Sequence, residues 1–334
     1  MVTPSITVVM PVFNDWKSAH KLVGEIDSVF RGSDHTLHII AVDDSSTEPY
    51  EDAVLLHTTN VERVTRLNLV GNVGHQRAIV IGLAWAEANC GSSLTAVMDS
   101  DGEDTPEELK RLVERAESDS DKVVVAQRAQ RSEGFAFRLF YQFYRFFFSG
   151  LTGHRINFGN FMVVPSRWRK RVLSDPNIWN NVAATMVRSR LPIAYLPTKR
   201  GHRYFGRSKM NFVSLVEHGL GAISVFAVSA FIRISVASVL LGMVSLIAAA
   251  AATWIRLNTD MHIPGWTTSM VGITLLISVQ AFFIPVMMAF VLLSNRSAGQ
   301  SLPKEHALAW IDSSDEILVD PHQNPHLKML IERA

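Results

Sequence analysis

Two long stretches without a charged residue constrain this chain more than any other feature. They are residues 234–255 and the longer stretch 263–295. A helix rises about 1.5 Å per residue, so each stretch is long enough to cross a hydrocarbon core of about 30 Å. A buried core helix is the alternative for each. Two such stretches in succession, with Trp254 and Trp266 beside the short link between them, favour membrane-spanning helices.

Basic residues flank this pair of stretches on its outer sides. Arg203, Arg207 and Lys209 precede the first stretch, and Arg296 and Lys304 follow the second. The link between the stretches holds one arginine against one aspartate. Because cytosolic loops carry an excess of lysine and arginine, this distribution predicts a helical hairpin with both chain ends in the cytosol.

The chain before the first stretch has the mixed composition of a soluble domain. The whole sequence is 48% hydrophobic and 19% charged, with the charges concentrated before residue 210. Its net charge of +1 gives no case for a nucleic-acid partner, which usually requires a clustered basic excess. The single cysteine, Cys90, excludes an internal disulfide and fits a reducing compartment. The N-terminus lacks the pattern of a signal peptide, so we expect this domain to stay in the cytosol.

Short β-branched runs, each ending in polar or turn residues, are typical of buried parallel strands. They are Ile6–Met10, His38–Asp43, Leu94–Met98 and Lys122–Ala126. Helical periodicity appears between them in Asp15–Phe30 and Gly74–Asn89. The alternation predicts a doubly wound, Rossmann-like α/β sheet. Ligands of such sheets bind at the carboxyl ends of the strands, so the residues that follow each strand are candidates for chemistry.

The sequence divides into four expected parts. These are a cytosolic domain over residues 1–210, a juxtamembrane amphipathic helix over 211–231, a two-helix transmembrane hairpin over 232–295 and a cytosolic C-terminal tail over 296–334, to which we assign no function. Within the first part, Phe135–Phe148 is rich in phenylalanine and tyrosine. This segment fits either a core helix or a helix at the membrane interface.

The strongest chemical signal is an acidic loop, Asp99-Ser100-Asp101-Gly102-Glu103-Asp104, directly after a predicted strand. Carboxylates so close together repel one another unless a cation or solvent compensates. Mg²⁺ typically takes one or two protein carboxylates and completes its shell with water and substrate phosphates, which suits Asp99 and Asp101 with Glu103 close by. The alternative is a solvated loop that caps the next helix through Asp104 or Thr105, and we expect it to hold for Asp104.

Polar residues also follow the other predicted strands. Asp43 and Asp44 suit hydrogen bonds to a base or to ribose hydroxyls, although Asp-Ser turns are common. Segment 11–15 ends the first strand, where a base could stack, and Asn14 or Asp15 as a plain helix cap is the alternative. Segment 72–76 suits phosphate binding or an ordinary turn, and we expect His75 to be packed or solvated rather than catalytic. The basic segment 200–209 suits lipid headgroups or a diphosphate.

Taken in order, these segments resemble the family-two glycosyltransferases of GT-A fold. The segments are VVMPVFND, VDDSS, NVGHQ, MDSDGEDTPE, Arg128 and HRYFGRSK. The nearest branch is the one similar to dolichol-phosphate mannose synthase and the bacterial polyprenyl-phosphate glycosyltransferases. The resemblance covers roughly residues 4–210, and the two spans that follow match that branch as well.

The resemblance implies a role for each matching residue. The nucleoside would be held by Pro11, Phe13, Asn14, Asp15, Val42, Asp43 and Asp44. Asp99 and Asp101, with Ser100 and Glu103 beside them, would hold a Mg²⁺ or Mn²⁺ ion on the diphosphate. Arg128, Arg203 and Lys209 would contact phosphates, and Asp99, Asp101, Arg203 and Lys209 would be the catalytic residues.

The implied reaction is an inverting, non-processive transfer of one sugar from a UDP- or GDP-sugar to a polyprenyl or dolichyl phosphate. Asn160 stands where several relatives carry an aspartate, and Glu103 where many carry a glutamine. A lipid phosphate is already an anionic nucleophile and needs no base. The Q-x-x-R-W signature of processive synthases is missing, because Val164 stands at the glutamine position before Arg167. The alternatives are a transferase acting on a neutral lipid or a polysaccharide, and a non-catalytic membrane scaffold. The family also leads us to expect a homo-oligomer.

Overall fold

The computed structural model describes residues 6–48, 58–128, 135–206, 212–259, 265–297 and 301–319. The chain divides into two compact units. The first unit comprises residues 1–134, 156–225 and 301–334, and the second comprises residues 135–155 and 226–300. Each unit is described by itself below.

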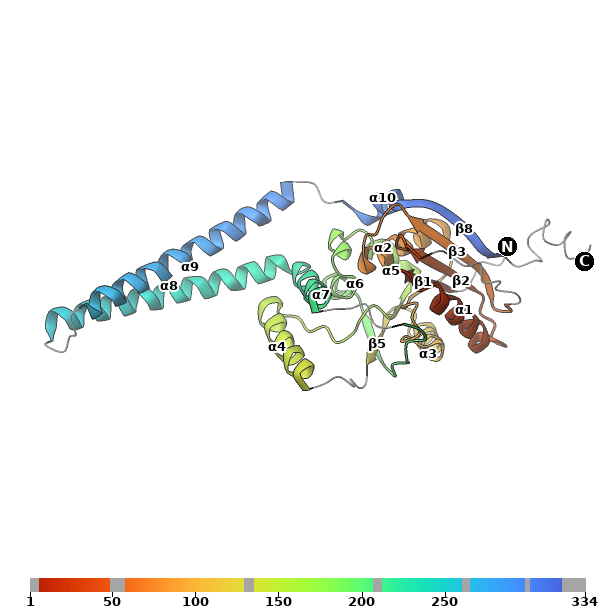
Figure 1. Cartoon of the computed structure of the whole chain (residues 1–334), viewed down its shortest axis with the longest axis horizontal. Helices are drawn as coiled ribbons and strands as arrows, with labels where there is room; N and C mark the ends of the chain where they lie inside the picture. The colour runs from red at the N-terminus through yellow and green to blue at the C-terminus, as the bar shows by residue number, and fades with distance from the viewer. Residues whose placement is uncertain are drawn as a thin grey trace, which may run out of the picture. The chain divides into compact units, whose positions relative to one another are not determined.

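The first unit is built on a mixed, mainly parallel sheet of eight strands in the order β7-β5-β6-β4-β1-β2-β3-β8 (Figure 1). The strands are β1 Ile6–Val12, β2 Leu37–Asp43, β3 Val61–Leu69, β4 Leu94–Val97, β5 Val123–Arg128, β6 Met162–Pro165, β7 Ile193–Thr198 and β8 Ile311–Val319. Strand β6 runs antiparallel to β4 and β5, and β8 runs antiparallel to β3. The other pairs are parallel, which confirms the predicted α/β class.

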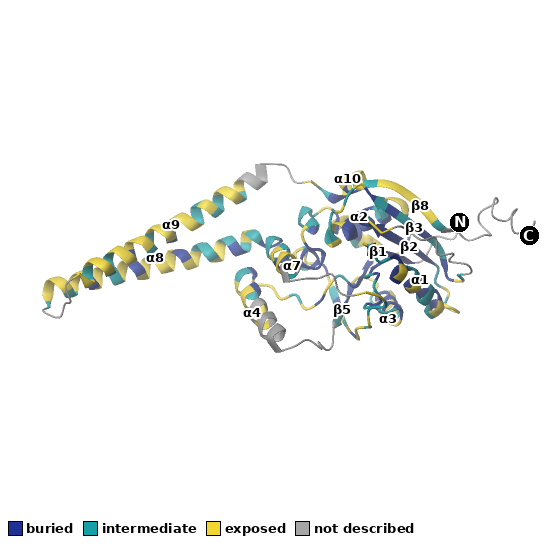
Figure 2. Ribbon diagram, viewed as in Figure 1, coloured by how far each residue is buried: buried dark blue, intermediate teal, exposed yellow. Residues whose placement is uncertain are grey.

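Helices cover both faces of this sheet. They are α1 Trp16–Phe30, α2 His75–Asn89, α3 Pro106–Ser118, α5 Ser166–Val172, α6 Val182–Arg188, α7 Phe212–Ser224 and α10 Pro303–His306, with 3₁₀ turns at Pro176–Trp179 and Ala307–Trp310. Alternate residues of β1 divide between two buried clusters: Val8 and Met10 pack with α1 and α3, whereas Val9 packs with α2, α5 and α6. The strands therefore alternate between two apolar layers, and most of the sheet is buried (Figure 2).

The elements predicted from hydrophobic pattern are present. The four predicted strands correspond to β1, β2, β4 and β5, and the two predicted helices correspond to α1 and α2. The helix after the acidic loop begins at Pro106 with Thr105 as its N-cap, since the Thr105 side chain accepts a hydrogen bond from the amide of Glu108. The expectation that Asp104 caps this helix is wrong. Its carboxylate instead accepts the Asp99 amide at 3.0 Å and braces the loop from within.

The C-terminal segment returns to the sheet as β8. Arg66 Nη2 lies 2.8 Å from Asp315 Oδ2, Asn68 donates to the same carboxylate at 2.8 Å, and Arg63 lies 3.6 Å from Glu316. These contacts and the antiparallel register fix β8 against β3. The segment predicted as a tail thus contains an edge strand of the domain.

The second unit contains α4 Phe135–Thr152, α8 Ala227–Asn258 and α9 Trp266–Ser297. Helices α8 and α9 are long and apolar enough to span a membrane, and only 6% of their most apolar windows is buried (Figure 2). They pack along a seam of small residues, where the Ser245 hydroxyl donates to the Thr274 carbonyl at 2.6 Å. Arg233, near the start of α8, donates to the carbonyls of Ser149 and Gly150 at the end of α4, so its guanidinium satisfies helix-end acceptors.

Candidate functional site

The acidic loop lies at the carboxyl end of β4, as predicted, and Asp101 is its most constrained member. Asp101 Oδ1 accepts the Glu103 amide at 2.9 Å, and Oδ2 accepts from Arg203 Nη1 at 2.8 Å. Burial, followed by the charge of the neighbouring Asp99 carboxylate, raises the pKa of Asp101 to about 6, although the Glu103 amide and Arg203 act in the opposite direction. The loop therefore holds a carboxylate that added positive charge would stabilise.

Added positive charge would also stabilise the Asp99 carboxylate. Its Oδ1 atom is shielded from solvent and accepts no hydrogen bond within the described part of the chain. The closest cationic candidate is His75, whose Nε2 lies 3.4 Å away. Carboxylate oxygens are the ligands that Mg²⁺ and Mn²⁺ prefer, so the donor set fits such an ion. Among the described residues no three His, Cys, Asp or Glu side chains are arranged around one metal position. A cation here would therefore take the rest of its ligands from water and phosphate.

A basic segment, Arg200–Phe205, runs along the acidic loop and pairs with it. The Gly201 amide donates to the Glu103 carbonyl at 2.8 Å, and the Tyr204 amide donates to the Asp101 carbonyl at 3.0 Å. Arg200 forms an ion pair with Glu103, while Arg203 bridges Asp101 and Asp15. The pattern places two guanidinium groups beside the predicted cation ligands.

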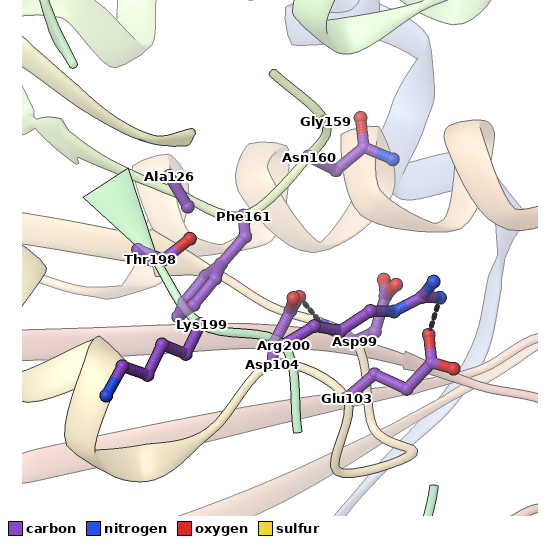
Figure 3. A pocket seen from close by; sticks show the side chains of 10 residues that line it. All are labelled: Asp99, Glu103, Asp104, Ala126, Gly159, Asn160, Phe161, Thr198, Lys199 and Arg200. Carbon is purple, nitrogen blue, oxygen red and sulfur yellow. Dashed lines mark hydrogen bonds and ion pairs between the residues drawn. The ribbon is translucent and has the colours of Figure 1, made fainter. Parts of the chain in front are cut away.

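A pocket opens between the acidic loop and the segment that precedes β6 (Figure 3). It is lined by Asp99, Glu103, Asp104, Ala126, Gly159, Asn160, Phe161, Thr198, Lys199 and Arg200. In Figure 3 the Lys199 side chain extends away from Asp99 and Glu103, whereas Arg200 reaches towards Glu103.

The end of β1 supplies the next group of predicted residues. Asp15 occupies the N-cap position of α1, but its side chain makes no capping hydrogen bond and instead pairs with Arg203. Asn14 has a φ of 50° and its Oδ1 accepts the amides of Thr47 and Glu48 at 2.7 and 3.0 Å. Phe13 is 39% exposed at the end of β1. Asp15 thus faces the acidic loop, and Asn14 fixes the loop beside it.

The acidic pair after β2 mainly organises the protein itself. Asp43 accepts from Trp16 Nε1 at 3.1 Å and from the Ser46 amide at 2.8 Å. Asp44 accepts the amides of Val73 and Gly74 at 2.7 and 2.9 Å. Burial raises the pKa of Asp44, although these two amides act in the opposite direction. Both Asp44 oxygens are therefore engaged in holding the loop before α2.

The other predicted site residues are placed as follows. Pro11 and Val42 pair in register on β1 and β2, and the Val42 side chain is completely buried in the core. Ser100 is buried within the acidic loop. The main chain of Arg128 pairs with Thr198 at the end of β5, and its side chain lies outside the described structure, as does the whole of Lys209. Their predicted phosphate contacts stay predictions.

Two residues at the site were not assigned a functional role from the sequence. Arg200 begins the predicted basic segment, but charge pattern alone does not tell which arginine meets Glu103. His75 contacts Asn160, with 3.1 Å between His75 Nε2 and Asn160 Nδ2, and the two residues are far apart in the sequence. The only sequence signal for His75 was its place in the segment before α2.

Comparison with known proteins places this geometry in a family. The family model described as Glycosyl transferase family 2 matches residues 7–173, half of the chain. The chain belongs to this family. Its match covers most of β1, the acidic loop and the segment that carries Asn160, whereas the basic segment Arg200–Phe205 lies beyond it.

The chain is also similar to individual members of the family. An uncharacterized glycosyltransferase of Bacillus subtilis is 22% identical over 277 residues, covering 81% of this chain and 83% of the relative. An undecaprenyl-phosphate 4-deoxy-4-formamido-L-arabinose transferase of Sodalis glossinidius is 30% identical over 141 residues, covering 40% of this chain and 41% of the relative. Among solved structures, glucosyl-3-phosphoglycerate synthase from Mycobacterium tuberculosis in complex with Mn²⁺, UDP-glucose and phosphoglyceric acid is 15% identical, with a TM-score of 0.47 over 68% of this chain and 80% of that one.

Proposed function

We propose that this glycosyltransferase moves one sugar from a UDP- or GDP-sugar to a polyprenyl or dolichyl phosphate, with inversion at the anomeric carbon. The observation that carries the proposal is the pairing of the acidic loop with Arg200 and Arg203 at the carboxyl end of the sheet. Carboxylates that hold a cation, beside guanidinium groups that bind phosphate, suit a nucleoside diphosphate leaving group. The similarity to undecaprenyl-phosphate transferases supports the acceptor class.

Each group has a task in this reaction. Asp99 and Asp101 would hold Mg²⁺ or Mn²⁺, which supplies Lewis-acid stabilisation of the departing diphosphate. Arg203 lies beside Asp101 and Asp15, where its guanidinium is placed to exchange a carboxylate partner for a phosphate oxygen. Phe13, exposed at the end of β1, would stack on the base.

The acceptor side of the pocket carries an amide rather than a carboxylate. Asn160 lines the pocket and cannot act as a general base. A phosphate monoester is already ionised at neutral pH, so its oxygen attacks without losing a proton. The presence of Asn160 therefore favours a phosphate over a hydroxyl as the nucleophile.

The membrane arrangement completes the proposal. Helices α8 and α9 would span the bilayer as a hairpin, with the sheet and both chain ends in the cytosol. Helix α7, with Val216 and Leu220 exposed on one side, would lie at the bilayer surface and bring the site near the lipid. The homo-oligomer expected from the family resemblance stays a prediction.

The test is transfer by the purified full chain in detergent or nanodiscs. A panel of labelled UDP- and GDP-hexoses is offered with Mn²⁺ or Mg²⁺ and either undecaprenyl phosphate or diacylglycerol. We expect one donor to label undecaprenyl phosphate only, and chelation of the cation to abolish labelling. Labelling of diacylglycerol alone, or of neither lipid, would rule out the proposed acceptor.

A pair of matched variants tests the cation site. Asp101→Asn keeps the size of the side chain but removes its charge, and we expect transfer to fall by at least about 100-fold, the scale of losing a main transition-state contact. Asp121→Asn, on the exposed surface away from the pocket, should retain wild-type transfer. Near wild-type synthesis by Asp101→Asn would defeat the assignment of Asp101 to the cation.

A further inference from the structure

His75 stands between a predicted cation ligand and the acceptor side of the pocket. Its Nε2 atom lies 3.4 Å from Asp99 Oδ1 and 3.1 Å from Asn160 Nδ2, and both partners line the pocket. The imidazole ring remains about half exposed, with 45% of its side-chain surface accessible. His75 is therefore within reach of a ligand that occupies this end of the pocket.

The loop that carries His75 is fixed from two directions. Asp44, which is buried, accepts the amides of Val73 and Gly74 directly before His75. On the other side, Gln76 Oε1 accepts the Val182 amide at the start of α6 at 2.8 Å. Gly74 has a φ of 86°, a conformation that glycine adopts without strain. A side chain held in this way is preorganised for binding.

The hydrogen-bond donors around the pocket are not equally available. Arg200 is paired with Glu103, Arg203 is paired with Asp101 and Asp15, and Lys199 extends away from the acidic loop (Figure 3). Beside Asp99, Asn160 Nδ2 donates to His75 Nε2, so the imidazole can donate to a ligand through Nδ1 and the amide through its second hydrogen. An anionic nucleophile that approaches the three pocket carboxylates needs such donors.

We propose that His75, whose Nε2 accepts a hydrogen bond from Asn160 Nδ2, donates through Nδ1–H to the phosphate of the lipid acceptor and positions it for attack. The inference rests on the proposed function and names the acceptor contact within it. In the step, a phosphate oxygen forms a bond to the anomeric carbon, the bond from that carbon to the diphosphate oxygen breaks with its electron pair, and no proton is transferred.

The test measures binding as well as transfer, using the full chain in detergent. Dissociation constants are determined for undecaprenyl phosphate and for undecaprenol, which lacks the phosphate. KM for undecaprenyl phosphate is measured with the donor found active in the panel above. We expect His75→Ala to raise KM and the dissociation constant for undecaprenyl phosphate at least tenfold, with little change for undecaprenol or for a nucleoside diphosphate with Mn²⁺.

Two further variants make the outcome specific. His75→Asn, whose terminal amide can restore a donor near the Nδ1 position, should recover part of the affinity. His306→Ala, on the exposed surface of α10, should behave as wild type. Unfolding temperatures of all variants are compared to show that each is folded.

The results separate the two proposals. The ratio of the two lipid dissociation constants shows how strongly a protein prefers undecaprenyl phosphate over undecaprenol. If this ratio is the same for His75→Ala and for wild type, the role of His75 is overturned. Loss of nucleoside diphosphate binding in this variant would also overturn it, because the contact would then belong to the donor. Failure of the wild-type protein to transfer sugar to undecaprenyl phosphate would instead refute the proposed function, and the lipid dissociation constants would still decide the role of His75.

Discussion

His38 is a buried histidine inside the sheet and links stability to pH. Its Nε2 lies 2.8 Å from Thr65 Oγ1, its Nδ1 lies 3.4 Å from Cys90 Sγ, and its ring packs edge-on against Trp85. Burial lowers the pKa of His38 to about 4 from an ordinary value of 6.5, and the positive charge of Arg63 lowers it further. The folded protein therefore holds this ring neutral.

Stability should fall as pH drops from 6.5 towards 4. In this window the unfolded chain binds a proton at position 38 and the folded chain does not, so acid favours unfolding. The free energy of unfolding falls by up to about 3 kcal/mol at the lower pH limit. Thermal unfolding of the full chain in detergent across this range measures the effect. His38→Gln should show a flatter pH dependence, whereas His306→Gln should match wild type. Equal slopes for His38→Gln and wild type would contradict the assignment.

The sequence predicted the position of some site residues and not of others. The acidic loop was predictable because carboxylates that directly follow a buried strand lie at the edge of the sheet where ligands bind. The hydrogen bonds from Val73 and Gly74 to Asp44 were not, since they join segments 29 and 30 residues apart. The contact between His75 and Asn160 likewise joins segments that are far apart in the sequence. The local sequence around His75 instead favoured a packed or solvated histidine.

At the scale of elements, the basic segment Arg200–Phe205 depends on a glycine in the acidic loop. Gly102 has a φ of 87°, and a Cβ atom added to it would lie 2.4 Å from the Tyr204 ring. Tyr204 is held in place by two hydrogen bonds. Its hydroxyl donates to Glu25, and its main-chain amide donates to the Asp101 carbonyl. The close approach lets Arg200 and Arg203 reach their carboxylate partners.

Gly102→Ala should therefore displace the basic segment. We expect transfer to fall by more than about tenfold and stability to fall by about 1–3 kcal/mol, the usual scale of backbone strain. Gly71→Ala is the matched control, because nothing lies within 4 Å of its added Cβ and its φ is not in the left-handed region. Transfer rates and unfolding temperatures of the two variants measure the difference. Similar losses in both would show that the contact with Tyr204 is unimportant.

Hydrophobic pattern predicted β1, β2, β4 and β5, and missed the short inner strand β6 together with β3 and the edge strands β7 and β8. Strands β1, β2, β4 and β5 are apolar runs, since most are covered on both faces. Strand β3 alternates buried residues with half-buried charged ones, and β8 is largely exposed and polar. Strand β8 forms because Asp315 and Glu316 meet Arg66 and Arg63 across the pair, a partnership set by the tertiary fold.

At the scale of the whole molecule, strand β8 constrains how the chain crosses a membrane. Strands β1 to β7 precede α8 and α9 in the sequence, whereas β8 follows them, yet all eight strands belong to one sheet. A sheet cannot lie on both sides of a bilayer, because its strands are joined by hydrogen bonds. If α8 and α9 both span, the chain must therefore return to the side from which it left.

A hairpin with the sheet in the cytosol predicts the accessibility of single cysteines, which the chain makes easy to test because its one cysteine, Cys90, is buried. Asp121→Cys lies in the first unit before the helices, Asp312→Cys lies on β8, and Asn258→Cys lies at the end of α8. In intact spheroplasts, a membrane-impermeant maleimide should label only the protein with Asn258→Cys. After permeabilisation all three should react. Labelling of Asp312→Cys without labelling of Asp121→Cys in intact spheroplasts would contradict the hairpin, since β8 would then lie on the opposite side from the strands with which the sheet requires it to pair.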